Sequence, residues 1–238
     1  MSKVLNSGFV EVYDVYGSDL TTVNAARVSF GKLKEKFDEK DAGLIKYLAD
    51  HEHTSPFRQT GIVFHMKMPI FVMRQFIRHG VGVAVNEISG RYVEFEEDFY
   101  IPDAFRKQST NNKQGSEVEI PEFFPHMVTA DDGVELEVNM FQSNLVDQYV
   151  AICRAAFNQY KRMCDMGVAK EMARMCLPLS TYTEFMAYMS LQSVAHFCRL
   201  RNDSHAQKEI MVYSNEMERT ATELFPHSFK ALMESGRA

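Results

Sequence analysis

The sequence predicts an α+β fold: a single domain with a mixed sheet and long helices. Segments that alternate apolar and polar residues, as strands do, are interspersed with segments of helical periodicity, without a regular strand–helix–strand order. No internal repeat is present. With 238 residues, of which 45% are hydrophobic, the chain is long enough to bury a substantial core without disulfide or metal staples.

The first half of the chain predicts three strands and three helices. Residues 8–15 alternate and are rich in β-branched and aromatic side chains, which favours a strand, and Asp19 or Thr21 can cap the helix that follows. Pro69 stands where a helix can begin, and Gly80 where it would stop. The predicted strands are 8–15, 61–68 and 92–100, and the predicted helices run from the cap to Val28, from the charged stretch 32–40 to His51, and from Pro69 to His79.

The second half is predicted to be mostly helical after a polar segment. Residues 105–144 are polar and are predicted to form an exposed, partly mobile insertion. Apolar residues at helical spacing then predict a long helix that Gly167 ends. The predicted helices are 145–166, 169–176, 191–201 and 205–224, and a strand is expected at 182–188.

The charge balance and the cysteines narrow the function class. With 26 Lys and Arg against 32 Asp and Glu, the net charge of −6 argues against a general nucleic-acid-binding surface. No apolar stretch reaches the ~20 residues of a membrane span. The four cysteines form no Cys-x-x-Cys pair, and we interpret them as reduced thiols of a cytoplasmic protein.

Two stretches, 74–80 and 86–92, carry the densest polar chemistry. On a helix, Arg74 and Arg78 would share a face, which favours an anion such as phosphate between them. Gly90 lets the backbone approach a ligand beside a guanidinium. The same spacing is equally compatible with a solvated arginine face that Gly80 simply ends.

The stretch 196–207 and the isolated Arg174 have structural explanations as well. Arg199–Asp203 and His205–Glu209 could be ordinary helix-surface pairs, and Arg174 alone is typical of a surface charge. The histidine spacing, as in His51 and His53, does not favour a metal site. No nucleophile elbow and no dinucleotide-binding fingerprint is present.

These motifs resemble those of the flavin-dependent thymidylate synthases, the ThyX family, over nearly the whole length. The matching stretches follow the same order as in that family: 8–11, 25–30, 53–57, 86–92, 177–179 and 200–207. The resemblance implies one catalytic domain over 1–238 with the polar insertion at about 105–144. It also implies a homotetramer with shared active sites, in which distant arginines could converge on one nucleotide.

The implied reaction is reductive methylation of dUMP to dTMP. Methylenetetrahydrofolate would give the carbon, FAD would carry hydride, and NADPH would reduce the flavin. Arg201 would be catalytic, stabilising the ionised uracil ring. The residues implied for dUMP are Arg74, Gln75, Phe76, Ile77, Arg78, Glu87, Ile88, Ser89, Gly90, Arg91, Arg174 and Arg201; those implied for FAD are Ser55, Arg78, His79, Gly80, Glu87, His196 and His205.

The sequence departs from the family pattern in two places. Where relatives have Arg-His-Arg, this chain has Arg78-His79-Gly80 and one more residue before Ser89. Where relatives often carry Asn-x-Arg, it has Ser190-Leu191-Gln192. We therefore expect weaker or repositioned FAD binding. Two alternatives stay open: hydroxymethylation of a pyrimidine deoxynucleotide on the same scaffold, and a non-catalytic nucleotide-binding relative.

Overall fold

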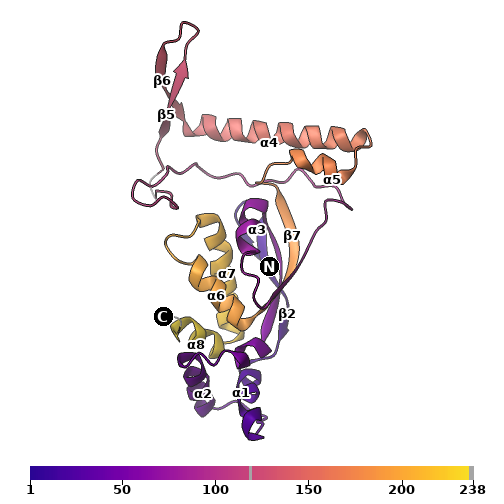
Figure 1. Cartoon of the computed structure of the whole chain (residues 1–238), viewed down its shortest axis with the longest axis vertical. Coiled ribbons are helices and arrows are strands. Elements are labelled where there is room, and N and C mark those ends of the chain that lie inside the picture. The colour runs from indigo at the N-terminus through magenta and orange to yellow at the C-terminus, as the bar shows by residue number, and fades with distance from the viewer. Residues whose placement is uncertain (118–119, 236–238) are drawn as a thin grey trace. The chain divides into compact units, whose positions relative to one another are not determined.

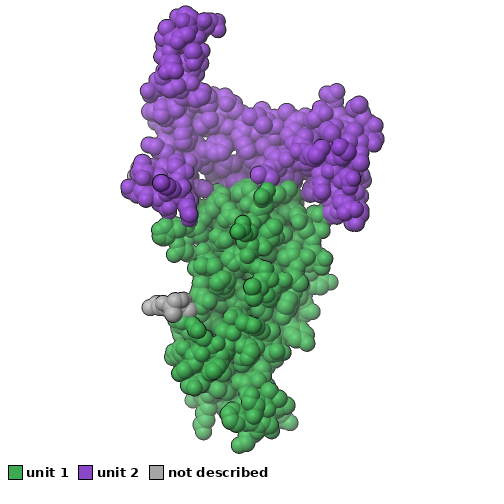
Figure 2. Space-filling model, in the orientation of Figure 1, with its two compact units in different colours: residues 1–88, 182–238 green, residues 89–181 purple. Residues whose placement is uncertain are grey.

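In the computed structural model, which describes residues 1–117 and 120–235, the chain forms two compact units (Figure 2). The first unit consists of residues 1–88 and the chain from 182 onward, and the second of residues 89–181. The polar segment 105–144 lies inside the second unit, whose bounds are wider than the predicted insertion.

The first unit is built on a five-stranded sheet of order β1-β2-β3-β7-β4. All four strand pairings are antiparallel, so the prediction of a mixed sheet was wrong. Periodicity identifies strands but not their partners, which is why the direction of pairing could not be read from the sequence. The strands are β1 (Ser2–Val4), β2 (Gly8–Tyr16), β3 (Gly61–Pro69), β7 (Tyr182–Ser190) and β4 (Val83–Glu87).

The two central strands pair along their whole length, from Gly61 opposite Ser190 to Pro69 opposite Tyr182. Alternate side chains of β3, including Phe64 and Met66, are fully buried, whereas His65 between them is only half-buried. The buried side faces α3 (Ile70–Phe76), α6 (Leu191–Arg201) and α7 (Lys208–Leu224), which lie against the sheet in Figure 1. This alternation is what a sheet with one covered face requires.

Three further helices group together beside this layer (Figure 1): α1 (Asp19–Arg27), α2 (Glu39–Asp50) and α8 (Ser228–Ser235). Short 3₁₀ turns, η1 (Val28–Phe30) and η2 (Ser55–Gln59), extend the connections. Ser18 caps α1, in place of the predicted Asp19 or Thr21. Asp19 is instead buried, and its carboxylate accepts backbone N–H groups of His227 and Ser228, 3.0 and 2.8 Å away.

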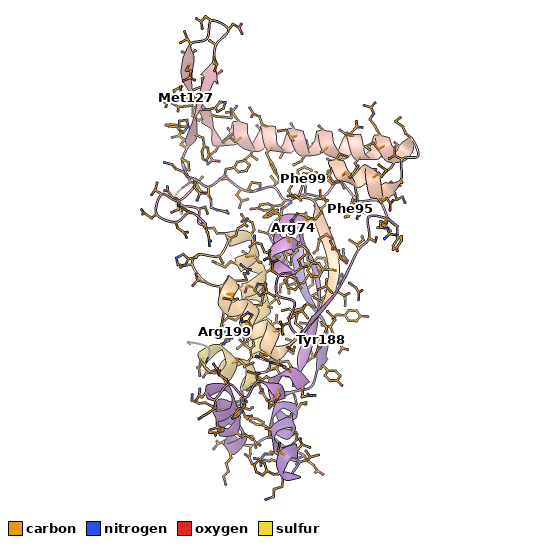
Figure 3. All side chains as sticks on the ribbon, in the orientation of Figure 1. Arg74, Phe95, Phe99, Met127, Tyr188 and Arg199 are labelled. Carbon is orange, nitrogen blue, oxygen red and sulfur yellow. The ribbon has the colours of Figure 1, made fainter. Side chains whose placement is uncertain are left out.

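The second unit contains the long helix α4 (Gln142–Asp165), the short α5 (Lys170–Ala173) and the turn η3 (Arg174–Cys176). Aromatic residues including Phe99 and Phe157 form its small core, and Phe95 packs against it; Figure 3 labels Phe99 beneath α4 and Phe95 beneath α5. The strands β5 (Phe123–Thr129) and β6 (Glu135–Phe141) form a two-stranded hairpin that leads directly into α4.

The predicted strand 92–100 does not form. Phe99 makes only an isolated bridge with Thr181, and the N–H of Phe95 is bound by the Tyr160 hydroxyl at 3.0 Å. The aromatic side chains that favoured a strand are used to pack against α4 instead.

The other predicted elements are present, with shifted ends. The third helix ends at Phe76, three residues before the predicted end, and the last long helix begins at Lys208. Four strands and one helix were not predicted: β1, β4, β5, β6 and α8. In the described part of the chain, no helix is long and apolar enough to cross a membrane.

Candidate functional site

A cavity of about 470 Å³ in the first unit lies between the turn after α3 and the start of α6. No carboxylate is among the described residues of its wall. The polar wall is dominated by groups that can donate hydrogen bonds, and it fits an anion. These groups are Arg58, Arg78, His79, Gln192, His196 and Arg199.

Residues 77–82, the turn between α3 and β4, form one wall of the cavity and are fixed by contacts at both ends. Phe76 anchors the end of α3 because its ring packs against those of Phe185 and Phe197, each at 5.3 Å between centroids. Gly82, with φ of +68°, lets the chain turn back, and its carbonyl accepts the N–H of Ser190 at 2.9 Å. The Ser193 hydroxyl donates to the carbonyl of Val81 at 2.6 Å.

This geometry corrects the predicted arginine pair. Because α3 ends at Phe76, Arg78 lies in the turn beyond the helix and does not share a helix face with Arg74. Arg78 lines the cavity, whereas Arg74 projects from α3 (Figure 3) and is not part of that wall. Gly80 is also in the wall, but it does not end the helix as predicted.

The side chain of Phe76, which the resemblance implied for dUMP, lies in the core. It is 1% exposed and belongs to the core, so only its backbone is available. Its neighbours are more accessible: Ile77 is exposed, and Gln75 donates from Nε2 to Oε1 of Gln207 at 2.5 Å.

Arg58 is a member of the cavity wall that sequence reasoning missed. It lies on η2, and its Nε donates to Oε1 of Gln192 at 2.6 Å while its Nη2 donates to Oγ1 of Thr54 at 3.2 Å. Its position next to the matching stretch 53–57 was the available signal, but nothing in the local pattern showed where the side chain would point.

His79 connects the cavity to Arg201. Nε of Arg201 donates to Nε2 of His79 at 3.0 Å, and the ring of His196 lies 6.0 Å from that of His79. Partial burial, followed by the positive charge of Arg201 and the neighbouring His196, lowers the pKa of His79 to about 4. Partial burial also lowers the pKa of Arg201.

The predicted surface pair Arg199–Asp203 is not what the structure contains. Arg199, which is labelled in Figure 3, donates from Nη1 to the carbonyl of Leu232 in α8, and the two atoms are 2.9 Å apart. Asp203 instead accepts from Nδ1 of His205 at 2.7 Å. Arg199 is thereby held in the cavity wall, while His205 lies outside that wall in the turn before α7.

Glu87 and Ile88 are placed by the end of β4. The Glu87 carboxylate accepts from the Thr183 hydroxyl at 2.5 Å, and the N–H of Ile88 donates to the carbonyl of Glu184 at 2.9 Å. Ser55 lies elsewhere in the first unit, in a separate hollow of about 540 Å³ that Arg27, Tyr47 and His53 also line. The structure therefore does not bring Ser55 to the cavity that holds Arg78.

In the second unit, Ser89, Gly90 and Arg91 lie against the start of η3. A Cβ built on Gly90 would stand 2.3 Å from the Phe95 ring and 3.2 Å from Cδ of Arg174, so glycine is what permits this approach. Arg91 lies near Glu171, with 3.6 Å between Nε and Oε2. The loop and Arg174, which are about 80 residues apart in sequence, form one basic cluster here.

Across residues 1–117 and 120–235, no group of three or more His, Cys, Asp or Glu side chains could hold a metal ion.

Comparison with known proteins gives a consistent result. Residues 11–227 match the family described as thymidylate synthase complementing protein. A flavin-dependent thymidylate synthase of Thermosipho africanus is 38% identical over 231 residues, which cover 97% of this chain and 93% of the relative. One from Thermus thermophilus is 41% identical over 235 residues, covering 97% of this chain and 77% of the relative.

A solved structure is also similar. The UMP/dUMP methylase PolB from Streptomyces cacaoi, bound with 5-Br dUMP, superposes with a TM-score of 0.78 at 30% sequence identity, and the match covers 98% of each chain.

Proposed function

Because the chain belongs to the family of flavin-dependent thymidylate synthases, we propose that it converts dUMP to dTMP by reductive methylation. Methylenetetrahydrofolate donates the carbon and NADPH reduces the flavin. The observation that carries this assignment furthest is the carboxylate-free cavity beside the His79–Arg201 pair, since it offers an anion site next to a held guanidinium. The PolB structure, with a dUMP analogue bound, supports the same substrate class.

The residues of the cavity fit an FAD molecule. FAD carries a diphosphate, and charge-assisted bonds from arginine are the strong way to hold phosphate oxygens. Arg78, His79, Gly80 and His196 are the wall residues that the resemblance also implied, and Gly80 has open space beside it. Bound there, FAD supplies the hydride that completes the methyl group.

Arg201 is the residue we assign to uracil activation. A guanidinium beside N3 and the neighbouring ring oxygen stabilises the negative charge that makes C5 nucleophilic. His79 accepts the Nε–H of Arg201, and that bond leaves the two Nη groups of Arg201 to contact the ring. In the second unit, Arg91 and Arg174 supply phosphate contacts, and the Ser89 hydroxyl, which accepts the N–H of Arg91 at 3.3 Å, is a binding group.

Two of the four cysteines, Cys153 and Cys198, are buried and are therefore unsuited to activating the ring as thiolates. Burial raises the pKa of Cys198 to about 12, and its Sγ lies 3.6 Å from the carbonyl of Ser214. Cys153 is buried as well. A buried thiol with a raised pKa is a poor nucleophile, so Cys198 does not supply the thiolate, and electrostatic activation by Arg201 is the route that we propose.

The direct test is one reaction with the purified protein, dUMP, methylenetetrahydrofolate, FAD and NADPH, with the product identified by mass. We expect a nucleotide that has gained a methyl group, and we expect Arg201→Gln to lose this product while still binding FAD. A hydroxymethyl product would replace the proposal with the alternative reaction. Absence of product despite dUMP binding would support a non-catalytic role.

We also propose that the protein assembles as a homotetramer. Tyr13 and Tyr16 of β2 are exposed, and so are Val128, Leu136 and Val138 of the β5–β6 hairpin. An isolated two-stranded hairpin is marginally stable in water, so a covering partner would stabilise it. Light scattering behind size-exclusion chromatography should give about four times the chain mass of 27.3 kDa, and a monomer at all concentrations would contradict the proposal.

A further inference from the structure

We propose that Arg58 supplies the cavity of the first unit with a cation for the diphosphate of FAD, and that Gln192 orients this cation. The proposal deepens the function proposed above and rests on it. Arg58 is exposed in the cavity wall, and its guanidinium is anchored at two points, by Oε1 of Gln192 at 2.6 Å and by Oγ1 of Thr54 at 3.2 Å.

The charge of Arg58 is not neutralised by these anchors. Both acceptors are uncharged, and none of the described residues forms an ion pair with Arg58. A guanidinium has five N–H donors in a planar fork, of which these two bonds use only a part. The remaining donors are available to a phosphate, which a fork can bind through two oxygens.

Other residues of the cavity wall are less able than Arg58 to supply a cation to a phosphate group. Arg199 already donates to the carbonyl of Leu232, so part of its donor capacity is used inside the protein. Gly80 has no side chain and Gln192 carries no charge, so neither of these wall residues supplies a cation. The Arg58 guanidinium ends beside Gln192, so it places a charge where the Gln192 side chain supplies none.

Gln192 acts as a positioning residue in this arrangement. Its Oε1 takes the Nε–H of Arg58, which fixes the plane of the guanidinium across the cavity wall. Because Gln192 comes from α6 and Arg58 from η2, exchanging the two side chains would return a guanidinium to nearly the same place from the opposite side. This reciprocity gives the proposal a specific test.

The experiment measures FAD affinity of the full-length protein by flavin fluorescence titration, without turnover. We expect Arg58→Gln to weaken FAD binding by about 10-fold or more, in line with the loss of a charge-assisted bond. The double variant Arg58→Gln with Gln192→Arg should recover most of that loss. Riboflavin, which has no phosphate, should bind the single variant and the wild type equally.

The same FAD titration is applied to a matched control variant, and it also gives the results that would overturn the proposal. Arg162→Gln removes the same charge from an exposed position on α4 and should leave FAD affinity unchanged. An Arg58→Gln variant that binds FAD as tightly as the wild type would overturn the proposal. So would equal weakening for riboflavin, or a double variant no tighter than the single one. A wild-type protein that binds no FAD would overturn the proposed function itself, and the role of Arg58 with it.

Discussion

Nε of Arg201 donates a hydrogen bond to Nε2 of His79, with 3.0 Å between the two nitrogens. Because Nε2 accepts, the histidine is neutral and carries its proton on Nδ1. Its depressed pKa of about 4 agrees with this state at neutral pH. His79 therefore acts on Arg201 as a fixed acceptor, in addition to standing in the cavity wall.

Replacing His79 should separate binding from chemistry. His79→Leu removes the acceptor, so we expect kcat to fall by about 10-fold or more, with a smaller change in KM for dUMP, because Arg201 loses its orientation. His79→Gln keeps an acceptor at a similar reach and should retain more of the activity. FAD titration of both variants shows whether the loss comes from cofactor binding, and equal kcat values for the two variants would contradict the positioning role.

Acid stability should depend on His79 with a defined sign. The folded pKa of about 4 lies below the reference value of 6.5, so the unfolded chain binds this proton first as the pH falls. The contribution of His79 to stability is complete above pH 6.5 and decreases between about pH 6.5 and pH 4. Thermal melts should show a larger fall in Tm across this range for the wild type than for His79→Gln, and parallel curves would argue against it.

Much of the fold follows from sequence periodicity, and the failures have physical causes. The strand of residues 61–68 and the helix of residues 191–201 are correct because one face of each is fully buried, which imposes a clear alternation or stripe. The prediction of a strand at 92–100 was wrong. The aromatic residues Phe95 and Phe99, which favoured a strand, pack on α4 instead. Edge strand β4 has no such alternation of buried and exposed residues.

Some residues of the candidate site could also be predicted from the sequence, and others could not. The basic cluster of Ser89–Arg91 with Arg174 followed from motifs, since the resemblance named all of these residues. Arg58 did not, because its role depends on a contact with Gln192 that is 134 positions away in sequence. Long-range side-chain contacts of this kind leave no periodic signal, and only the folded structure brings them together.

Gly90 should be intolerant of any side chain. A methyl group there would stand 2.3 Å from the Phe95 ring and 3.2 Å from Arg174, so Gly90→Ala must displace one of them. We expect dUMP affinity, measured by calorimetry, to fall by about 10-fold, as for the loss of one charge-assisted phosphate contact. Gly43→Ala, on α2 of the first unit, where nothing lies within 4 Å of an added Cβ and φ is not in the left-handed region, is the comparison for a glycine change away from this cluster. Unchanged dUMP affinity in Gly90→Ala would show that this cluster does not hold the nucleotide.

Gly80, unlike Gly90, should tolerate a side chain, because a Cβ built there points into open space. A Cβ at this position has no neighbour within 4 Å, and the backbone φ is not in the left-handed region, so Gly80→Arg should be accommodated without strain. The new guanidinium would join Arg58 and Arg78 around the cavity, and we expect FAD to bind about 10-fold more tightly. Gly80→Met adds similar length without charge and should give no such gain. If Gly80→Arg also left FAD affinity unchanged, the longer loop before Ser89 would have carried position 80 away from the bound diphosphate, and the cation at Arg58 would have no functional equivalent on that side of the cavity.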